Sequence, residues 1–169
     1  NKHPLKCNYL SITEGDMKGV KVVSGCKKIL FSVGIKAEKF APVSAEQQMM
    51  LKQKYGFDPS KPLVIHVGHC SKGRGLEDFA KIHTAQRMVV ASGMFEDENV
   101  IRILNEARVK IHKGYLENVE EVYQMADAYL FPTRSAEFVI SIPLSVMEAL
   151  SCGVPVIGYK SFENLNEIT

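Results

Sequence analysis

A glycine-rich loop with two cations carries the clearest chemical signal in the sequence. It runs Gly68-His69-Cys70-Ser71-Lys72-Gly73-Arg74-Gly75, directly after an apolar run and just before a segment of helical period. Glycines let a backbone approach a ligand closely, and a helix start with Lys72 and Arg74 favours an anion such as phosphate. The loop is not a Walker motif, because Arg74 and Gly75 stand where Lys and Ser or Thr are required. From these residues alone, an anion site and a plain glycine-rich turn remain alternatives.

A glutamate in a later predicted helix is the second candidate. Glu148 follows Leu144 by four residues and so lies one turn beyond the helix start. There the first-turn amides can hold a phosphate while the carboxylate accepts hydrogen bonds from a ribose diol. A solvated surface glutamate is the alternative, but the neighbours Met147, Ala149 and Leu150 are apolar and favour a half-buried side chain.

Other polar groups are assigned structural roles. Glu96-Asp97-Glu98 could mimic an acidic metal site, but acids are common in a first helical turn because they complement the helix dipole, and we favour that role. His66 alternates into an apolar strand and is expected to be a core histidine, whereas His69 can touch a ligand in the loop. No Ser-His-Asp or Cys-His arrangement has a local motif context.

Short apolar runs alternate with helical segments from Lys61 onward. The runs predict strands at 63–67, 88–91, 109–111, 128–131 and 154–157. Helices are expected at 76–84, 97–107, 118–127 and 144–151, with a further helix at 45–55. Asn118 and Glu121 have the spacing of an N-terminal capping box. This alternation predicts an α/β fold, a Rossmann-like open parallel sheet with helices on both faces, and ligands beyond the carboxyl ends of the strands.

Composition limits the classes of function. The 169 residues include 21 Lys or Arg and 19 Asp or Glu, a net charge of +2 that is too small for a general nucleic-acid binder, so any anion site must be local. No apolar run is long enough to span a membrane, and the four separated cysteines are expected to be reduced thiols, which together predict a cytoplasmic protein. Because the chain lacks an initial Met and stops within a predicted helix, we expect a piece of a larger protein, truncated at both ends.

From about Lys28 to its end, the chain resembles the C-terminal, nucleotide-sugar-binding half of a GT-B glycosyltransferase of the large retaining group numbered family four. Residues 148–157, Glu-Ala-Leu-Ser-Cys-Gly-Val-Pro-Val-Ile, are similar to the signature E-A-M-A-x-G-x-P-V-V. Gly68-His69, four residues, then Arg74-Gly75 match the spacing of the family's phosphate loop. Residues 31–42 are similar to its interdomain segment. The resemblance implies a lead-in or interdomain segment at 1–44 that packs on the sheet, and a donor-binding domain at 45–169.

The resemblance also implies a role for each matching position. Arg74 and Glu148 are the expected catalytic residues. The donor diphosphate is expected at Arg74, Gly75, His69, Leu144 and Ser145, and the ribose at Glu148. The nucleobase is expected at Gly114 and Leu116. Ile140 stands where the family has its first glutamate, so the donor sugar is assigned to Glu137, Ser141, Ile142 and Pro143.

The implied activity of the full-length protein is a glycosyltransferase of the hexosyltransferase type. It would transfer a sugar from a nucleotide-diphosphate sugar to an unknown acceptor, with retention of configuration and with no metal or other cofactor. Its partner is an N-terminal acceptor-binding domain, with no nucleic acid and no transmembrane segment. Any association with the inner face of a membrane would be peripheral, through that domain, and the isolated chain is expected to be inactive. The alternatives are a nucleotide-sugar epimerase or hydrolase, and a non-catalytic regulatory domain that kept the fold.

Overall fold

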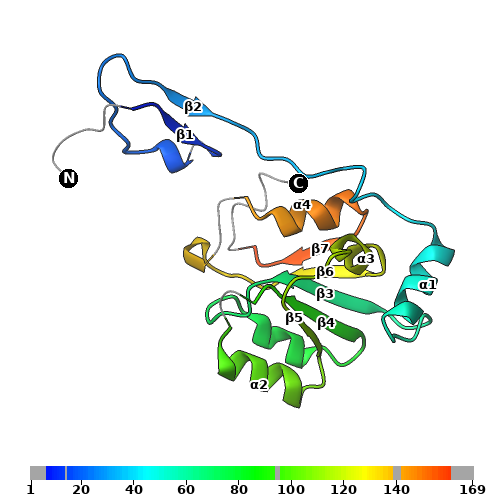
Figure 1. Ribbon diagram of the computed structural model, residues 1–169. Helices are drawn as coiled ribbons and strands as arrows, with labels where there is room; N and C mark the ends of the chain where they lie inside the picture. The colour runs from blue at the N-terminus through cyan, green and yellow to red at the C-terminus, as the bar shows by residue number, and fades with distance from the viewer. Residues whose placement is uncertain (1–6, 14, 94–95, 139–141, 161–169) are drawn as a thin grey trace. The chain divides into compact units, whose positions relative to one another are not determined.

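The computed structural model describes residues 7–13, 15–93, 96–138 and 142–160 (Figure 1). The chain divides into two compact units, Asn1–Gly34 and Ile35–Thr169, which are described separately. The second unit begins inside the segment expected to be a lead-in. Phe40 is buried in the core of this unit, and its carbonyl accepts a hydrogen bond from Ser151 Oγ at 2.6 Å. The packing of the rest of the lead-in on the sheet stays a prediction.

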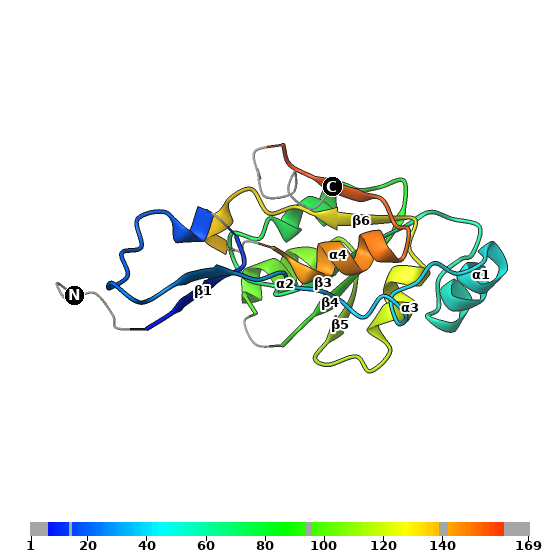
Figure 2. The same cartoon turned by 90° about the horizontal axis from the view of Figure 1, so that it is seen from above.

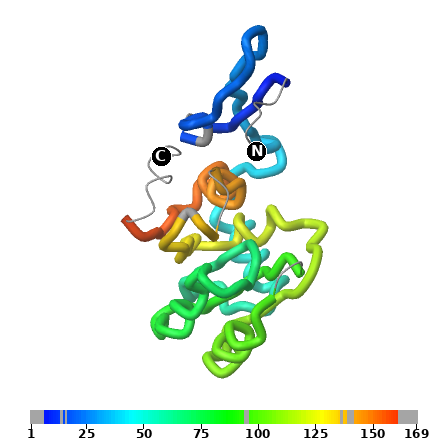
Figure 3. The backbone as a smooth tube through the Cα atoms, turned by 90° about the vertical axis from the view of Figure 1, so that its left-hand side faces the viewer, coloured from blue at the N-terminus to red at the C-terminus, as the bar shows by residue number. Residues whose placement is uncertain are grey.

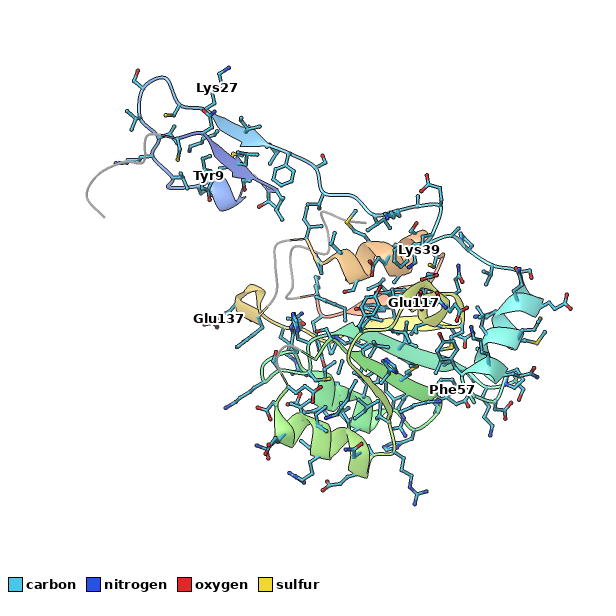
Figure 4. The ribbon with its side chains drawn as sticks, in the orientation of Figure 1. Tyr9, Lys27, Lys39, Phe57, Glu117 and Glu137 are labelled. Carbon is cyan, nitrogen blue, oxygen red and sulfur yellow. The ribbon has the colours of Figure 1, made fainter. Side chains whose placement is uncertain are left out.

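The first unit holds a pair of short parallel strands. Strand β1 (Tyr9–Ser11) pairs with β2 (Lys28–Leu30) in the register Tyr9 to Lys28, and a 3-10 turn, η1 (Gly15–Met17), lies between them in sequence. Figure 4 labels Tyr9 and Lys27 in this unit, and the amide of Tyr9 donates to the carbonyl of Lys27 at 2.8 Å. Strand β2 contains the apolar pair Ile29-Leu30, both exposed.

The second unit is built on a parallel sheet, as the alternating pattern predicts. Within the described residues its strands have the order β5-β4-β3-β6-β7, and every pair is parallel. They span β3 (Leu63–Gly68), β4 (Gln86–Ala91), β5 (Lys110–Lys113), β6 (Ala128–Phe131) and β7 (Val156–Gly158). The predicted strands are confirmed, with ends displaced by up to two residues, because apolar runs mark a buried strand better than its termini.

Helices connect these strands. The four α-helices of the described chain are α1 (Ala45–Lys54), α2 (Glu98–Glu106), α3 (Val119–Gln124) and α4 (Leu144–Ser151). The segment predicted as a helix at 76–84 forms instead a 3-10 helix, η2 (Leu76–Lys81). Leu76 and Phe79 are both fully buried, and a three-residue spacing on one face suits the 3-10 period. No helix among the described residues is long and apolar enough to cross a membrane.

The predicted capping box of α3 is wrong, although the helix begins where expected. Asn118 occupies the N-cap position, but its side chain makes no capping hydrogen bond. Glu121 instead accepts from Lys54 Nζ at 2.7 Å and from the hydroxyl of Tyr55 at 2.8 Å. These contacts with α1 hold the glutamate away from the helix start, so tertiary pairing overrides the local capping pattern.

Helices lie on both sides of the sheet (Figures 1 and 3), and the buried residues form two separate apolar clusters. Leu63 and Ile65 of β3 join one cluster with Val122 and Tyr123 of α3 and Val146 of α4. The opposite cluster contains side chains of β4, η2 and α2, among them Val89, Ala91, Leu76, Phe79, Val100 and Leu104. Helices therefore cover both faces of the sheet, and the predicted fold class is confirmed.

Candidate functional site

Two loops diverge from the centre of the sheet. Strand β3 is followed along the chain by β4 and β5 on one side, whereas β6 and β7 lie on its other side. The loop after β3 covers residues 68–75 and the loop after β6 covers residues 132–143, so both leave the carboxyl ends of adjacent strands (Figure 2). Such a topological switch point is where open α/β sheets bind ligands. The two motifs found in the sequence thus meet at the expected edge.

The two loops are in close contact. A Cβ atom added to Gly75 would lie 2.4 Å from the carbonyl oxygen of Pro132, and one added to Gly73 would lie 2.6 Å from the ring of Phe138. Both glycines have a positive φ, +87° at Gly73 and +74° at Gly75. Glycine is required here because it allows this backbone conformation and leaves space for the neighbouring loop.

Arg74 has no anionic partner among the described residues. Its side chain is half-buried, and its Nε is buried and has no hydrogen-bond partner among the described residues. Burial lowers the pKa of Arg74, which reports the cost of removing the guanidinium from water. A charged donor in this state is normally paired, so the position calls for an anionic ligand.

His69 lies in the same loop, at the start of the predicted phosphate site. Its Nδ1 and the Oγ of Ser92, which follows β4, are 2.6 Å apart. Burial, and then the nearby charge of Arg74, lower the pKa of His69 and favour the neutral ring. His69 can therefore act as a hydrogen-bonding group near Arg74 without adding a second positive charge at neutral pH.

The start of α4 holds main-chain donors that lack an acceptor within the described part of the chain. Pro143 occupies the N-cap position and provides no side-chain cap, and its carbonyl accepts from the amide of Val146 at 3.0 Å. The amides of Leu144 and Ser145 have no main-chain acceptor among the described residues. Free first-turn amides and the positive end of the helix dipole suit an anion.

The side chain of Ser145 is hydrogen-bonded to Tyr129 of β6. The hydroxyl of Tyr129 lies 2.9 Å from Ser145 Oγ and 3.0 Å from the carbonyl of Val67 at the end of β3. Tyr129 is fully buried, and burial raises its pKa. The charge of Glu148 raises this pKa further, and the charge of Arg74 lowers it.

Glu148 is half-buried, as its apolar neighbours indicate. Its Oε2 accepts a hydrogen bond from the hydroxyl of Tyr123, on α3, at 2.7 Å. Burial raises the pKa of Glu148, while the bond from Tyr123 and the charge of Lys39 lower it. Because Glu148 lies three residues beyond Ser145, the two side chains share a face of α4.

A small cavity adjoins the phosphate loop. It has a volume of about 220 Å³ and is lined by the carboxyl ends of β3 and β4 and by the segment after β5. Two of the lining residues are Gly114 and Leu116, the predicted nucleobase contacts, and the others are Val67, Gly68, Val90, Ser92, Tyr115 and Val119. The structure thus brings these two residues next to the loop that contains Arg74.

The expected donor-sugar residues are less completely placed. Glu137 lies on a 3-10 turn, η3 (Ala136–Phe138), is exposed and points outward (Figure 4). Ile142 is partly buried and Pro143 is buried directly before α4. Ser141 lies outside the described residues. A role for these residues in binding the sugar stays a prediction.

The structural roles assigned from sequence agree with the geometry. His66 is buried, and its Nδ1 lies 3.0 Å from the carbonyl of Leu130. Asp97 is the N-cap of α2 and accepts from the amides of Asn99 and Val100, while Glu96 pairs with Lys113 at 2.7 Å. A larger hollow of about 490 Å³ lies beside α2, but charged side chains that pair with one another line it, so we place the site at the switch point.

Three residues of the site were missed from the sequence. Tyr123 and Tyr129 orient the two polar side chains of α4, and Ser92 contacts His69. Both tyrosines lie on apolar stripes, where an aromatic residue is ordinarily part of the core. No spacing in the sequence distinguishes them from packing residues.

Comparison with known proteins supports the resemblance. The family model for glycosyl transferases group 1 matches residues 62–169. The sulfoquinovosyl transferase SQD2 of Arabidopsis thaliana is 28% identical over 138 residues, covering 78% of this chain and 26% of that protein. The N-acetyl-alpha-D-glucosaminyl L-malate synthase of Bacillus anthracis is 30% identical over 120 residues, covering 65% of this chain and 30% of that protein. The chain thus spans less than a third of the length of these relatives.

Solved structures share the fold. Alr3699/HepE of Anabaena, in complex with UDP-glucose, superposes with a TM-score of 0.75 at 15% identity, covering 96% of this chain and 47% of that chain. A sucrose-phosphate synthase of Thermosynechococcus elongatus gives 0.65 at 20% identity, covering 90% of this chain and 40% of that chain. At these identities the likeness concerns the fold.

Proposed function

The chain belongs to the family of glycosyl transferases group 1, and we propose that it is the donor-binding domain of an enzyme that uses a nucleotide-diphosphate sugar. The names of two relatives, a sulfoquinovosyl transferase and a glucosaminyl malate synthase, support transfer of a sugar. The UDP-glucose bound to a protein of the same fold supports a nucleotide sugar as donor. The acceptor would be bound by an N-terminal domain of the full-length protein.

The observation that carries this proposal is the unpaired, half-buried guanidinium of Arg74. Its buried Nε has no partner among the described residues, and it lies in a loop at the switch point of the sheet. A diphosphate would supply the missing anion, and the planar guanidinium can donate two parallel hydrogen bonds to phosphate oxygens. The loop that holds it packs against the segment leading to α4.

Each of the remaining groups would bind a different part of the donor. The amides of Leu144 and Ser145 would contact the diphosphate together with Arg74, Gly75 and His69. Glu148 would accept hydrogen bonds from the ribose hydroxyls. The base would enter the 220 Å³ cavity beside Gly114 and Leu116.

The proposed reaction breaks the bond between the anomeric carbon of the sugar and the distal phosphate oxygen. Negative charge then grows on the departing diphosphate, and Arg74 and the start of α4 stabilise it electrostatically. The acceptor hydroxyl oxygen forms the new bond to the anomeric carbon with retention of configuration, its proton passes to the departing diphosphate, and the leaving diphosphate needs no metal. This hexosyl transfer requires the N-terminal domain, so the isolated chain would bind the donor without appreciable turnover.

Binding of nucleotides to this chain tests the proposal. Calorimetry with UDP, GDP, ADP and their glucose or mannose derivatives should identify at least one ligand that binds more tightly than millimolar. Replacing Arg74 by Met removes a charged hydrogen-bond donor worth about 1.5–3 kcal/mol, so affinity should fall by roughly ten- to a hundredfold. Arg102→Met is the matched control, because Arg102 pairs with Glu106 on the surface of α2. Equal affinities of the two variants would contradict the role of Arg74.

Transfer itself is tested with the full-length protein. Proton NMR of the product should show the same anomeric configuration as the donor. Activity should persist in excess EDTA, since no step uses a metal. An inverted product, or loss of activity that added divalent metal restores, would refute the corresponding part of the mechanism.

A further inference from the structure

A tyrosine on α3 is bonded to the carboxylate that we assign to the ribose. The hydroxyl of Tyr123 donates to Oε2 of Glu148 at 2.7 Å, and the tyrosine is fully buried. Among the described residues, no other side chain donates to this carboxylate. Its Oε1 is therefore available to a ligand.

The ring of Tyr123 is fixed on two sides. Phe40 packs edge-on against it with ring centroids 5.8 Å apart, and the ring of Tyr129 lies at the same centroid distance, tilted by 33°. A buried ring packed in this way keeps its hydroxyl in one place. A glutamate in a helix has several rotamers, and ordering such a side chain costs up to about 2 kcal/mol. The hydroxyl thus selects one position for a carboxylate that would otherwise move.

The hydroxyl also affects the charge of the carboxylate. Burial raises the pKa of Glu148, whereas the hydrogen bond from Tyr123 and the charge of Lys39 lower it. Two further titratable groups, Tyr129 and Cys152, lie close enough for the charge of Glu148 to raise their pKa values. Lys39 itself forms an ion pair with Glu120 of α3 at 3.0 Å and donates a hydrogen bond to the carbonyl of Glu117, just before that helix (Figure 4).

We propose that Tyr123 is a positioning residue for nucleotide binding, which holds the Glu148 carboxylate through Oε2 and leaves Oε1 to the ribose hydroxyls. This inference rests on the proposed function, because it takes Glu148 as the ribose contact. It predicts that the preference for ribose over 2′-deoxyribose depends on a buried hydroxyl that the ligand never touches.

The first test compares ribose with deoxyribose. Tyr123→Phe keeps the ring and removes the hydroxyl, and its folding is checked by circular dichroism. With UDP, GDP and ADP as probes, this variant should bind the nucleotide preferred by the wild type about tenfold more weakly, with little change for the 2′-deoxy form. Tyr55→Phe is the matched control, because its hydroxyl donates to Glu121 at 2.8 Å in a purely structural pair. An unchanged ribose preference in Tyr123→Phe would overturn the inference.

The second test separates positioning from simple structural damage. In a Glu148→Gln background, Tyr123→Phe should have little further effect on nucleotide affinity, because the carboxylate on which it acts is gone. A tenfold further loss in that background would indicate damage to the fold and would overturn the inference.

The third test needs no nucleotide. Carboxyl-carbon NMR should show that the titration midpoint of Glu148 rises in Tyr123→Phe and not in Tyr55→Phe, because the lost hydrogen bond stabilised the ionised form. An unchanged midpoint would overturn the inference. A raised midpoint in a protein that binds none of the nucleotides would support the Tyr123–Glu148 link while contradicting the proposed function.

Discussion

Replacing Gly75 by alanine places one methyl group at the junction of the two site loops. Gly75 has a φ of +74°, in the left-handed region. The added Cβ would lie 2.4 Å from the carbonyl oxygen and 3.2 Å from the carbonyl carbon of Pro132. Because the neighbour is backbone, it cannot move aside by changing a rotamer. One of the two loops must shift.

The magnitude follows from two contributions. A left-handed conformation costs a residue with a Cβ about 1–2 kcal/mol. Forcing a methyl group into occupied space typically costs about 1–3 kcal/mol more, so Gly75→Ala should lose about 2–5 kcal/mol of unfolding free energy. Gly56 supplies the matched control. Its φ is +73°, but the nearest atom to its added Cβ is the side-chain Nζ of Lys110 at 3.5 Å, an ordinary contact distance, so Gly56→Ala should lose about 1–2 kcal/mol.

Urea unfolding followed by circular dichroism measures both losses, and an unchanged slope shows that the unfolded states are comparable. Calorimetry with the preferred nucleotide adds a functional measurement. Gly75→Ala should weaken binding by displacing Arg74 from the start of α4, whereas Gly56→Ala should leave affinity unchanged. Equal losses of stability in the two variants would show that the contact between the loops contributes nothing and would refute the argument.

Three further predictions follow from single contacts. The hydroxyl of Tyr129 has one proton and lies near the carbonyl of Val67, which can only accept, so Ser145 donates its own proton to Tyr129. Ser145→Ala removes this bond, which holds the start of α4, so it should cost about 1 kcal/mol of stability in urea and weaken nucleotide binding by up to about fivefold; an unchanged affinity would contradict this. Burial lowers the pKa of His66 from 6.5 to about 4. Because only the unfolded chain takes up the proton between these values, the free energy of unfolding should fall by about 3 kcal/mol as the pH drops from 6.5 to about 4. Urea unfolding of His66→Gln should show a shallower pH dependence over that range, and parallel curves would exclude His66 as the cause. Asp97→Ala should cost about 1 kcal/mol by removing the cap of α2, with nucleotide affinity unchanged in calorimetry.

The fold was largely predictable because its sheet is buried on both faces. Runs such as residues 63–67 and 128–131 are nearly continuous in apolar side chains, as a strand covered by helices requires. The predictions that were wrong depend on contacts with distant parts of the chain, which a local sequence pattern does not include. Glu121 has the spacing of a capping box, but Lys54 and Tyr55 on α1 offer it stronger partners. The 3-10 form of η2 depends on burying Leu76 and Phe79 together, which only the packed sheet imposes.

The candidate site could be proposed from sequence where it is made of a glycine-rich backbone loop. Gly73, Arg74 and Gly75 stand out because glycine and a cation in a loop before a helix have few structural uses. The buried residues that bond to the side chains of the candidate site were not predictable. Tyr123 and Tyr129 occupy core positions, and a hydroxyl that serves the site differs from a core phenylalanine by a single atom.

These two tyrosines explain how the short helix α4 can hold its polar groups in fixed positions. Helix α4 begins at a proline without a side-chain cap, so its own sequence does little to fix its start. Tyr129 bonds to Ser145 in its first turn, and Tyr123 bonds to Glu148 one turn later. Their rings are packed against each other, and both belong to the buried cluster that includes Val146 and Ala149 of α4. The amides and the carboxylate are therefore held at a fixed separation from the phosphate loop, which is the condition for one ligand to engage all of them at once.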